Sequence, residues 1–172
     1  RLKAEGFVIE KLPTVGGEVD LKALEGALSE DVILVSCMMV NNETGALYDT
    51  ARVGKLMKMA SPDAFLHVDA TQSYLKIPFT KRSIGADLIT VSSHKIEGPK
   101  GVGALIIDPN VIKTRGIAPQ ILGGGQEKGY RSGTENVPAV AAFGKAIEVN
   151  YPALSKNREK LLSLKDHLKT PI

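Results

Sequence analysis

The 172-residue sequence has one cysteine and three histidines, so it has few of the side chains that cross-link a chain or bind zinc, and it has no tryptophan. The single cysteine, Cys37, cannot form a disulfide within the chain and lies in the apolar run 32–40. This pattern favours a reducing, cytoplasmic compartment. The histidines, His67, His94 and His167, do not have the spacing of a zinc site. We therefore expect no metal centre.

Long apolar runs and a strong charge of one sign are also missing. No segment approaches the roughly 18 to 20 apolar residues that cross a bilayer, and no apolar segment of signal-peptide type follows the charged residues 1–5. The formal net charge is only +3, and the basic residues are scattered along the chain. Neither a membrane surface nor a nucleic acid is therefore expected as a partner.

What is present is an alternation of short apolar runs with amphipathic segments. The first short apolar run is at 7–9. Strands are predicted at 32–40, 64–68, 87–91 and 102–107, and helices at 20–28, 49–60, 137–149 and 153–168. This order is typical of parallel βαβ units, with the last two strands as an antiparallel extension. We predict an α/β fold, a three-layer sandwich around a mainly parallel sheet.

The two ends of the sequence suggest part of a longer protein. The chain starts without methionine, and residues 2–5 resemble the last turn of a helix capped by Gly6. The last amphipathic helix, expected to stop at 170–172, has no later element to pack against. We expect a further domain beyond it.

Polar residues follow three of the apolar runs. Asn42, Asp69 and Lys95 each stand just after a predicted strand, and open α/β sheets bind ligands outside the carboxyl ends of their strands. A pyridoxal cofactor needs a lysine amine, a carboxylate for its pyridine nitrogen, hydrogen-bond donors for its ring oxygen and donors for its phosphate. The chain offers a candidate for each of these groups.

Each candidate also has an ordinary structural explanation. Most lysines are surface residues, so Lys95 alone is not specific, and Asp69 alone is more simply a turn or cap residue. The segment 131–136 precedes a helix and could bind a phosphate there, but it is also a common capping sequence. His67 should face the same side of its strand as Asp69, where a satisfied core histidine is the simpler interpretation.

The order of the motifs is more specific than any one residue. They are Asn-Asn-Glu-Thr-Gly at 41–45, His-Val-Asp-Ala-Thr-Gln-Ser at 67–73, Ser-Ser-His-Lys at 92–95 with Gly-Pro-Lys-Gly at 98–101, Gly-Gly-Gly-Gln-Glu at 123–127 and Arg-Ser-Gly-Thr at 131–134. Together they resemble the cysteine desulfurase family, which are class V aminotransferase-type, fold type I enzymes that use pyridoxal 5′-phosphate. The resemblance runs over essentially the whole chain.

The resemblance implies a role for seven residues. Lys95 matches the lysine that forms the Schiff base with the cofactor, and with the adjacent His94 it is the catalytic candidate. The cofactor-binding candidates are Asp69 at the pyridine nitrogen, Asn42 and Gln72 on the ring-oxygen side, Ser92 and His94 on the phosphate side, and Thr134. In the family this threonine reaches the cofactor of the neighbouring subunit, so the resemblance implies a homodimer.

The resemblance further implies the large cofactor-binding domain of fold type I, with residues 1–150 as its central part and 151–172 as a helix toward an absent C-terminal domain. The implied activity converts L-cysteine to L-alanine and transfers sulfur as a persulfide to an acceptor or iron-sulfur scaffold protein. The family's sulfur-accepting cysteine is expected outside this chain, because Cys37 lies in an apolar run. We therefore expect the chain by itself to be inactive.

Two alternatives remain open at this point. The same ring contacts would serve a selenocysteine lyase or a cysteine sulfinate desulfinase. The chain could also act as a non-catalytic dimerisation or scaffold piece.

Overall fold

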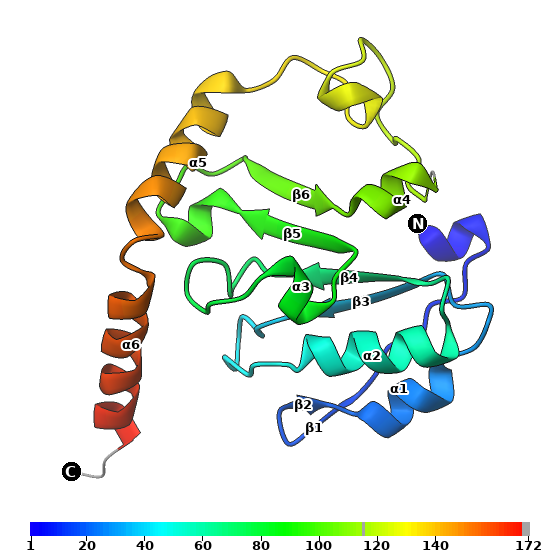
Figure 1. Ribbon diagram of the computed structural model, residues 1–172, viewed down its shortest axis with the longest axis horizontal. Coiled ribbons are helices and arrows are strands. Elements are labelled where there is room, and N and C mark those ends of the chain that lie inside the picture. Colours follow the sequence, from blue (N-terminus) through cyan, green and yellow to red (C-terminus); the bar gives the residue numbers. More distant parts are fainter. Residues whose placement is uncertain (115, 170–172) are drawn as a thin grey trace.

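The computed structural model describes residues 1–114 and 116–169, and its centre is a four-stranded sheet in the order β3-β4-β5-β6 (Figure 1). Strands β3 (Leu34–Met38), β4 (Phe65–Asp69) and β5 (Leu88–Ser92) are parallel, and β6 (Gly103–Ile107) is antiparallel to β5. A separate antiparallel pair joins β1 (Thr14–Val15) to β2 (Glu18–Val19). The predicted α/β class and the antiparallel extension of a mainly parallel sheet are confirmed.

The helices connect these strands and follow them. They are η1 (Leu2–Glu5), α1 (Leu21–Ala27), α2 (Thr50–Ala60), α3 (Lys81–Ile84), η2 (Ser93–Ile96), α4 (Pro109–Lys113), η3 (Glu127–Gly129), α5 (Val137–Asn150) and α6 (Leu154–Lys169). All four helices predicted from the sequence are present. The apolar run at 7–9 forms no sheet ladder among the described residues, and Val8 is 90% exposed.

Side-chain caps determine where several helices begin. The carboxylate of Asp20 accepts from the backbone N–H groups of Lys22 and Ala23, both at 3.0 Å, at the start of α1. This satisfies two amides that have no partner within the helix, and it confirms Asp20 as the N-cap. Gly6 ends η1 with φ at 92°, the left-handed conformation expected of a C-cap glycine.

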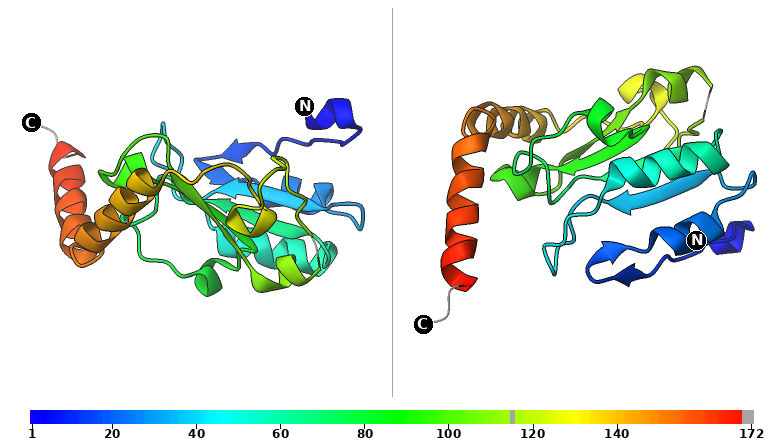
Figure 2. Two further views of the ribbon diagram at one scale, coloured as in Figure 1. Left: turned by 90° about the horizontal axis from the view of Figure 1, so that it is seen from above. Right: turned by 60° about the horizontal axis from the view of Figure 1, so that its bottom comes forward.

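The two faces of the sheet differ in how well they are covered. Leu66, Val68, Ile89 and Val91 alternate along β4 and β5 and are buried in one cluster with side chains of α1, α2 and α5. Figure 2 shows α2 lying along this side of the sheet. These described residues supply the sheet and one helical layer of the expected sandwich.

The opposite face is covered at the amino end of β4. There Gly116 lies so close to Phe65 that an added Cβ would be 2.5 Å from the ring, and Val111 is buried beside it. Toward the carboxyl ends of the strands this face carries polar, half-buried or exposed residues, namely Ser36, His67, Asp69, Thr90 and Ser92. The two faces therefore divide the sheet into a core side and a polar side.

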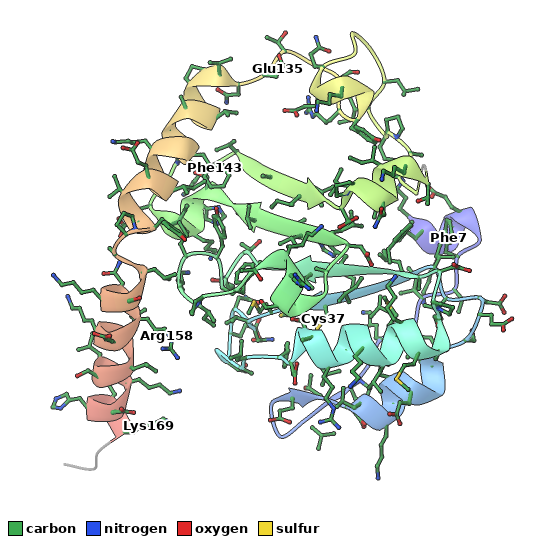
Figure 3. All side chains as sticks on the ribbon, in the orientation of Figure 1. Phe7, Cys37, Glu135, Phe143, Arg158 and Lys169 are labelled. Carbon is green, nitrogen blue, oxygen red and sulfur yellow. The ribbon has the colours of Figure 1, made fainter. Side chains whose placement is uncertain are left out.

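Helix α6 extends away from the sheet and has no buried residue (Figure 1). Its side chains Arg158 and Lys169 are exposed (Figure 3). This is compatible with the predicted boundary at residue 150, which stays a prediction. Residues 170–172, where the helix is expected to stop, lie outside the described residues.

Candidate functional site

Two parallel strands bring the candidate residues to one edge of the sheet. Asp69 is the last residue of β4, and Ser92 is the last residue of β5, immediately before η2. Asp69 pairs with Thr90 across the ladder, and Thr90 and Ser92 are two residues apart, so all three face the polar side. Lys95 follows three residues later in η2.

Asp69 has one occupied and one available carboxylate oxygen. The backbone N–H of Thr71 donates to Oδ1 at 2.9 Å, so the turn expected from sequence is present. Within residues 1–114 and 116–169, Oδ2 has no hydrogen-bond or ion-pair partner, although the residue is half-buried. A half-buried carboxylate oxygen without a partner is suited to a ligand N–H.

The Ser92–Lys95 motif forms a tight turn after β5. The hydroxyl Oγ of Ser92 lies 2.8 Å from Nδ1 of His94, so the structure brings these two candidates into direct contact. Lys95 is half-buried, and its Nζ has no partner among the residues that the structure describes. Behind the turn, the N–H of Gly98 donates to the carbonyl of Ser93 at 3.1 Å.

A second lysine, which the sequence analysis missed, lies near Lys95. Burial, and to a lesser extent the positive charge of Lys95, lower the pKa of Lys76 below its usual value. Lys76 belongs to the loop after β4, where Leu75 has a positive φ of 55°, an uncommon conformation for a branched residue. The position of Lys76 in the loop after a parallel strand is the sequence signal that could have indicated it as a site residue. Two amines close together give this edge a field that favours anions such as phosphate.

The other candidates are less closely assembled. Gln72 is half-buried in the turn after β4, whereas Asn42 is exposed. The turn after β3 is formed by Asn41 instead, whose Oδ1 accepts from the N–H groups of Glu43 and Thr44 at 2.9 Å.

Thr134 lies apart from the strand ends. It is exposed on the segment before α5, and the adjacent Glu135 lies beyond β6 as seen from β5 (Figure 3). The structure therefore does not bring Thr134 together with Asp69 and Lys95 within one chain. The helix after it is capped by Asn136, whose Oδ1 accepts from the N–H of Ala139 at 3.3 Å.

Cys37 faces the core side of the sheet. Its neighbour Met38 pairs with Asp69, so Cys37 points to the opposite face (Figure 3). Its Sγ donates to the carbonyl of Met38 at 3.2 Å, and burial raises the pKa of the thiol to about 11. A thiol with so little thiolate at neutral pH is a poor nucleophile, which supports the view that Cys37 is not the sulfur acceptor.

Two classes of site are not found in the described part of the chain. It holds no group of three or more His, Cys, Asp or Glu side chains placed to bind a metal ion. None of its helices is long and apolar enough to cross a membrane.

The turn that carries Lys95 depends on a glycine. A Cβ at Gly98 would lie 2.0 Å from Oγ of Ser93 and 3.1 Å from its carbonyl oxygen. We expect Gly98→Ala to lower the free energy of unfolding by about 2 kcal/mol or more through overpacking. Gly144→Ala is the matched control, because nothing lies within 4 Å of a Cβ there; it should raise stability by about 0.5–1 kcal/mol as alanine replaces glycine in a helix. Urea unfolding of both variants checks this, and equal effects would contradict it.

Comparison with known proteins agrees with this arrangement. The family model described as aminotransferase class V matches residues 1–170. The chain belongs to the class V aminotransferase family. Among curated members, it is 43% identical over 168 residues to cysteine desulfurase IscS 1 of Archaeoglobus fulgidus, covering 97% of this chain and 42% of that protein. It is 40% identical over 171 residues to cysteine desulfurase IscS of Escherichia coli, covering 98% of this chain and 41% of the relative.

Solved structures show the same fold. A NifS-like protein superposes with a TM-score of 0.84 at 39% identity, over 97% of this chain and 47% of the other. The NifS-like protein from Rickettsia africae superposes with a TM-score of 0.82 at 41% identity, over 92% of this chain and 43% of the other. The chain thus spans about two fifths of the length of the curated relatives it matches, and the family resemblance inferred from its motifs is confirmed.

Proposed function

We propose that this chain forms the cofactor-binding part of a pyridoxal 5′-phosphate-dependent cysteine desulfurase, which converts L-cysteine to L-alanine and passes the sulfur on as a persulfide. One observation carries the proposal: Lys95 and Asp69 lie at one edge of the sheet, each with an atom that has no partner among the described residues. Class V membership and relatives named cysteine desulfurase support it.

The residues present fit the cofactor. A pyridinium N–H needs an acceptor, and Oδ2 of Asp69 is a half-buried acceptor with no partner among the described residues. A phosphate needs donors and positive charge, for which the Ser92–His94 pair and Lys76 are close to Lys95. We assign Gln72 and, from the turn after β3, Asn42 to the ring-oxygen side.

When bound, pyridoxal phosphate serves as an electron sink for charge that develops at the substrate α-carbon. The chain's own task is to hold and move protons around that carbon. Lys95, on a tight turn at the strand end, is placed to take the α-proton through Nζ. Asp69 supplies a fixed negative charge at the same edge of the sheet, and the positive charges of Lys76 and Lys95 attract anionic groups.

Several finer features belong to this proposal. Because Thr134 lies apart from its own chain's strand ends, its proposed phosphate contact requires a second subunit, and we propose a homodimer. A cytoplasmic location, residues 1–150 as the large domain and 151–172 as a helix toward a small domain are proposed with it. We also propose a sulfur-acceptor or iron-sulfur scaffold protein as the partner.

The test is alanine release from L-cysteine by the complete gene product that carries this sequence, with pyridoxal phosphate added. We expect alanine and an equal amount of sulfur, held as protein persulfide and released as sulfide when a thiol reductant such as dithiothreitol is added. Alanine release from L-cysteine sulfinate and L-selenocysteine should be slower. Faster turnover of either of those substrates would replace the proposed specificity. A protein that carries the cofactor but releases no alanine from any of the three would contradict the proposed activity.

A further inference from the structure

A row of polar side chains crosses three strands just before Asp69. His67 on β4 lies between two hydroxyls: its Nδ1 is 2.8 Å from Oγ of Ser36 on β3, and its Nε2 is 3.2 Å from Oγ1 of Thr90 on β5. Both ring nitrogens therefore have partners. The expectation that His67 is a satisfied histidine is confirmed, although it lies on the polar face rather than in the core.

This row is built next to the carboxylate of the proposed site. Thr90 is the ladder partner of Asp69 as well as the hydrogen-bond partner of His67. His67 precedes Asp69 by two residues and so shares its face of the sheet. The flanking strands present hydroxyls to the ring, and within the described part of the chain Asp69 is the charged group whose field acts on it.

Two opposing influences set the charge of the imidazole. Burial lowers the pKa of His67 below its usual value, and the negative charge of Asp69 raises it by a smaller amount. The ring is therefore neutral at neutral pH. A neutral ring can donate from one nitrogen and accept at the other, which matches two hydroxyl partners that can do either.

We propose that the imidazole of His67 is a positioning group that keeps the negative charge of Asp69 available for a ligand cation. This rests on the proposed function, in which that cation is the protonated ring of the cofactor. A charged imidazolium beside Asp69 would neutralise the carboxylate that the ligand needs. A neutral ring that is hydrogen-bonded to Ser36 and Thr90 holds the side chains of this face in place and does not pair with the carboxylate of Asp69.

Protonation of His67 and cation binding at Asp69 must affect each other equally. If a cation bound at Asp69 favours neutral His67, then protonation of His67 must weaken binding of that cation by the same factor. The neutral state is present above the folded-state pKa of His67 and is lost as the pH falls through it. We expect the additional loss of affinity at low pH to be about fivefold or more.

The first test needs no ligand. In the complete gene product with 15N-labelled histidine, the His67 ring resonances, assigned by their absence in His67→Gln, should titrate below the usual midpoint for histidine. Asp69→Asn should lower that midpoint further, because the charge that favours the imidazolium is gone. Asp63→Asn, at an exposed residue in the α2–β4 connection, should leave it unchanged. A midpoint that Asp69→Asn does not move would overturn the proposal.

The second test measures pyridoxal phosphate affinity from pH 8 to pH 5 by equilibrium dialysis. The His67→Gln variant should bind pyridoxal phosphate with the parent's affinity at pH 8. At low pH it should not show the additional loss of affinity that the parent shows. Thr90→Ser, which keeps the hydroxyl, should behave as the parent. Parallel curves for parent and His67→Gln would overturn the positioning role. Reducible attachment at Lys95 is measured separately at pH 8, so failure of the proposed function is distinguishable from failure of this inference.

Discussion

Lys95→Ala should abolish covalent attachment of pyridoxal phosphate. The expected result is complete loss of the mass that borohydride reduction adds to the protein after incubation with the cofactor. The reason is chemical, since the attachment requires a primary amine and that of Lys95 lies at the strand-end edge with no partner among the described residues. Intact-mass measurement before and after reduction checks this.

Two other lysines serve as controls for that experiment. Lys76 is close enough to Lys95 for the two charges to interact, so Lys76→Ala should keep the attachment while weakening phosphate affinity. Lys100 is exposed five residues further along the chain, and Lys100→Ala should have no effect. Retained attachment in Lys95→Ala, or its loss in Lys100→Ala, would refute the assignment of Lys95.

Asp69→Asn should weaken cofactor binding strongly while leaving the fold intact. Asparagine keeps an oxygen to accept from the N–H of Thr71, but it removes the negative charge offered at Oδ2. A hydrogen bond to a charged group contributes about 1.5–3 kcal/mol, and partial solvent exposure reduces this. We expect roughly a tenfold to hundredfold higher Kd for pyridoxal phosphate, measured at pH 8.

Stability separates this site effect from a structural one. In the described chain the carboxylate of Asp69 takes part in no ion pair, so Asp69→Asn should change the unfolding free energy without cofactor by about 0.5 kcal/mol or less. Asp63→Asn is again the surface control and should change neither quantity. A large loss of stability in Asp69→Asn with unchanged affinity would mean that Asp69 is structural.

Most of the fold could be predicted from the sequence because its pattern is local. Apolar runs such as 64–68 and 87–91 indicate strands, and caps such as Asp20 indicate where helices begin. These signals were sufficient to predict the parallel strands and the antiparallel strand β6. The segment 7–9 has the same apolar composition, yet it is exposed and forms no strand. A strand requires a hydrogen-bonded neighbour, which composition does not specify.

The site residues that stand at the ends of strands could be predicted from the sequence. The contacts between side chains on neighbouring strands could not. Alternation correctly predicted that His67 and Asp69 share a face. It could not predict that Ser36 and Thr90 would lie on either side of His67, because that contact depends on the register of three strands. The proximity of Lys76 to Lys95 depends in the same way on two segments that follow neighbouring strands, the loop after β4 and the η2 turn after β5.

The most direct measurement is a peptide map of the complete gene product after pyridoxal phosphate is bound and reduced with borohydride. We expect one modified peptide from this chain, which contains Lys95, at close to one cofactor per subunit. Modification spread over exposed lysines, or concentrated at a lysine other than Lys95, would contradict it.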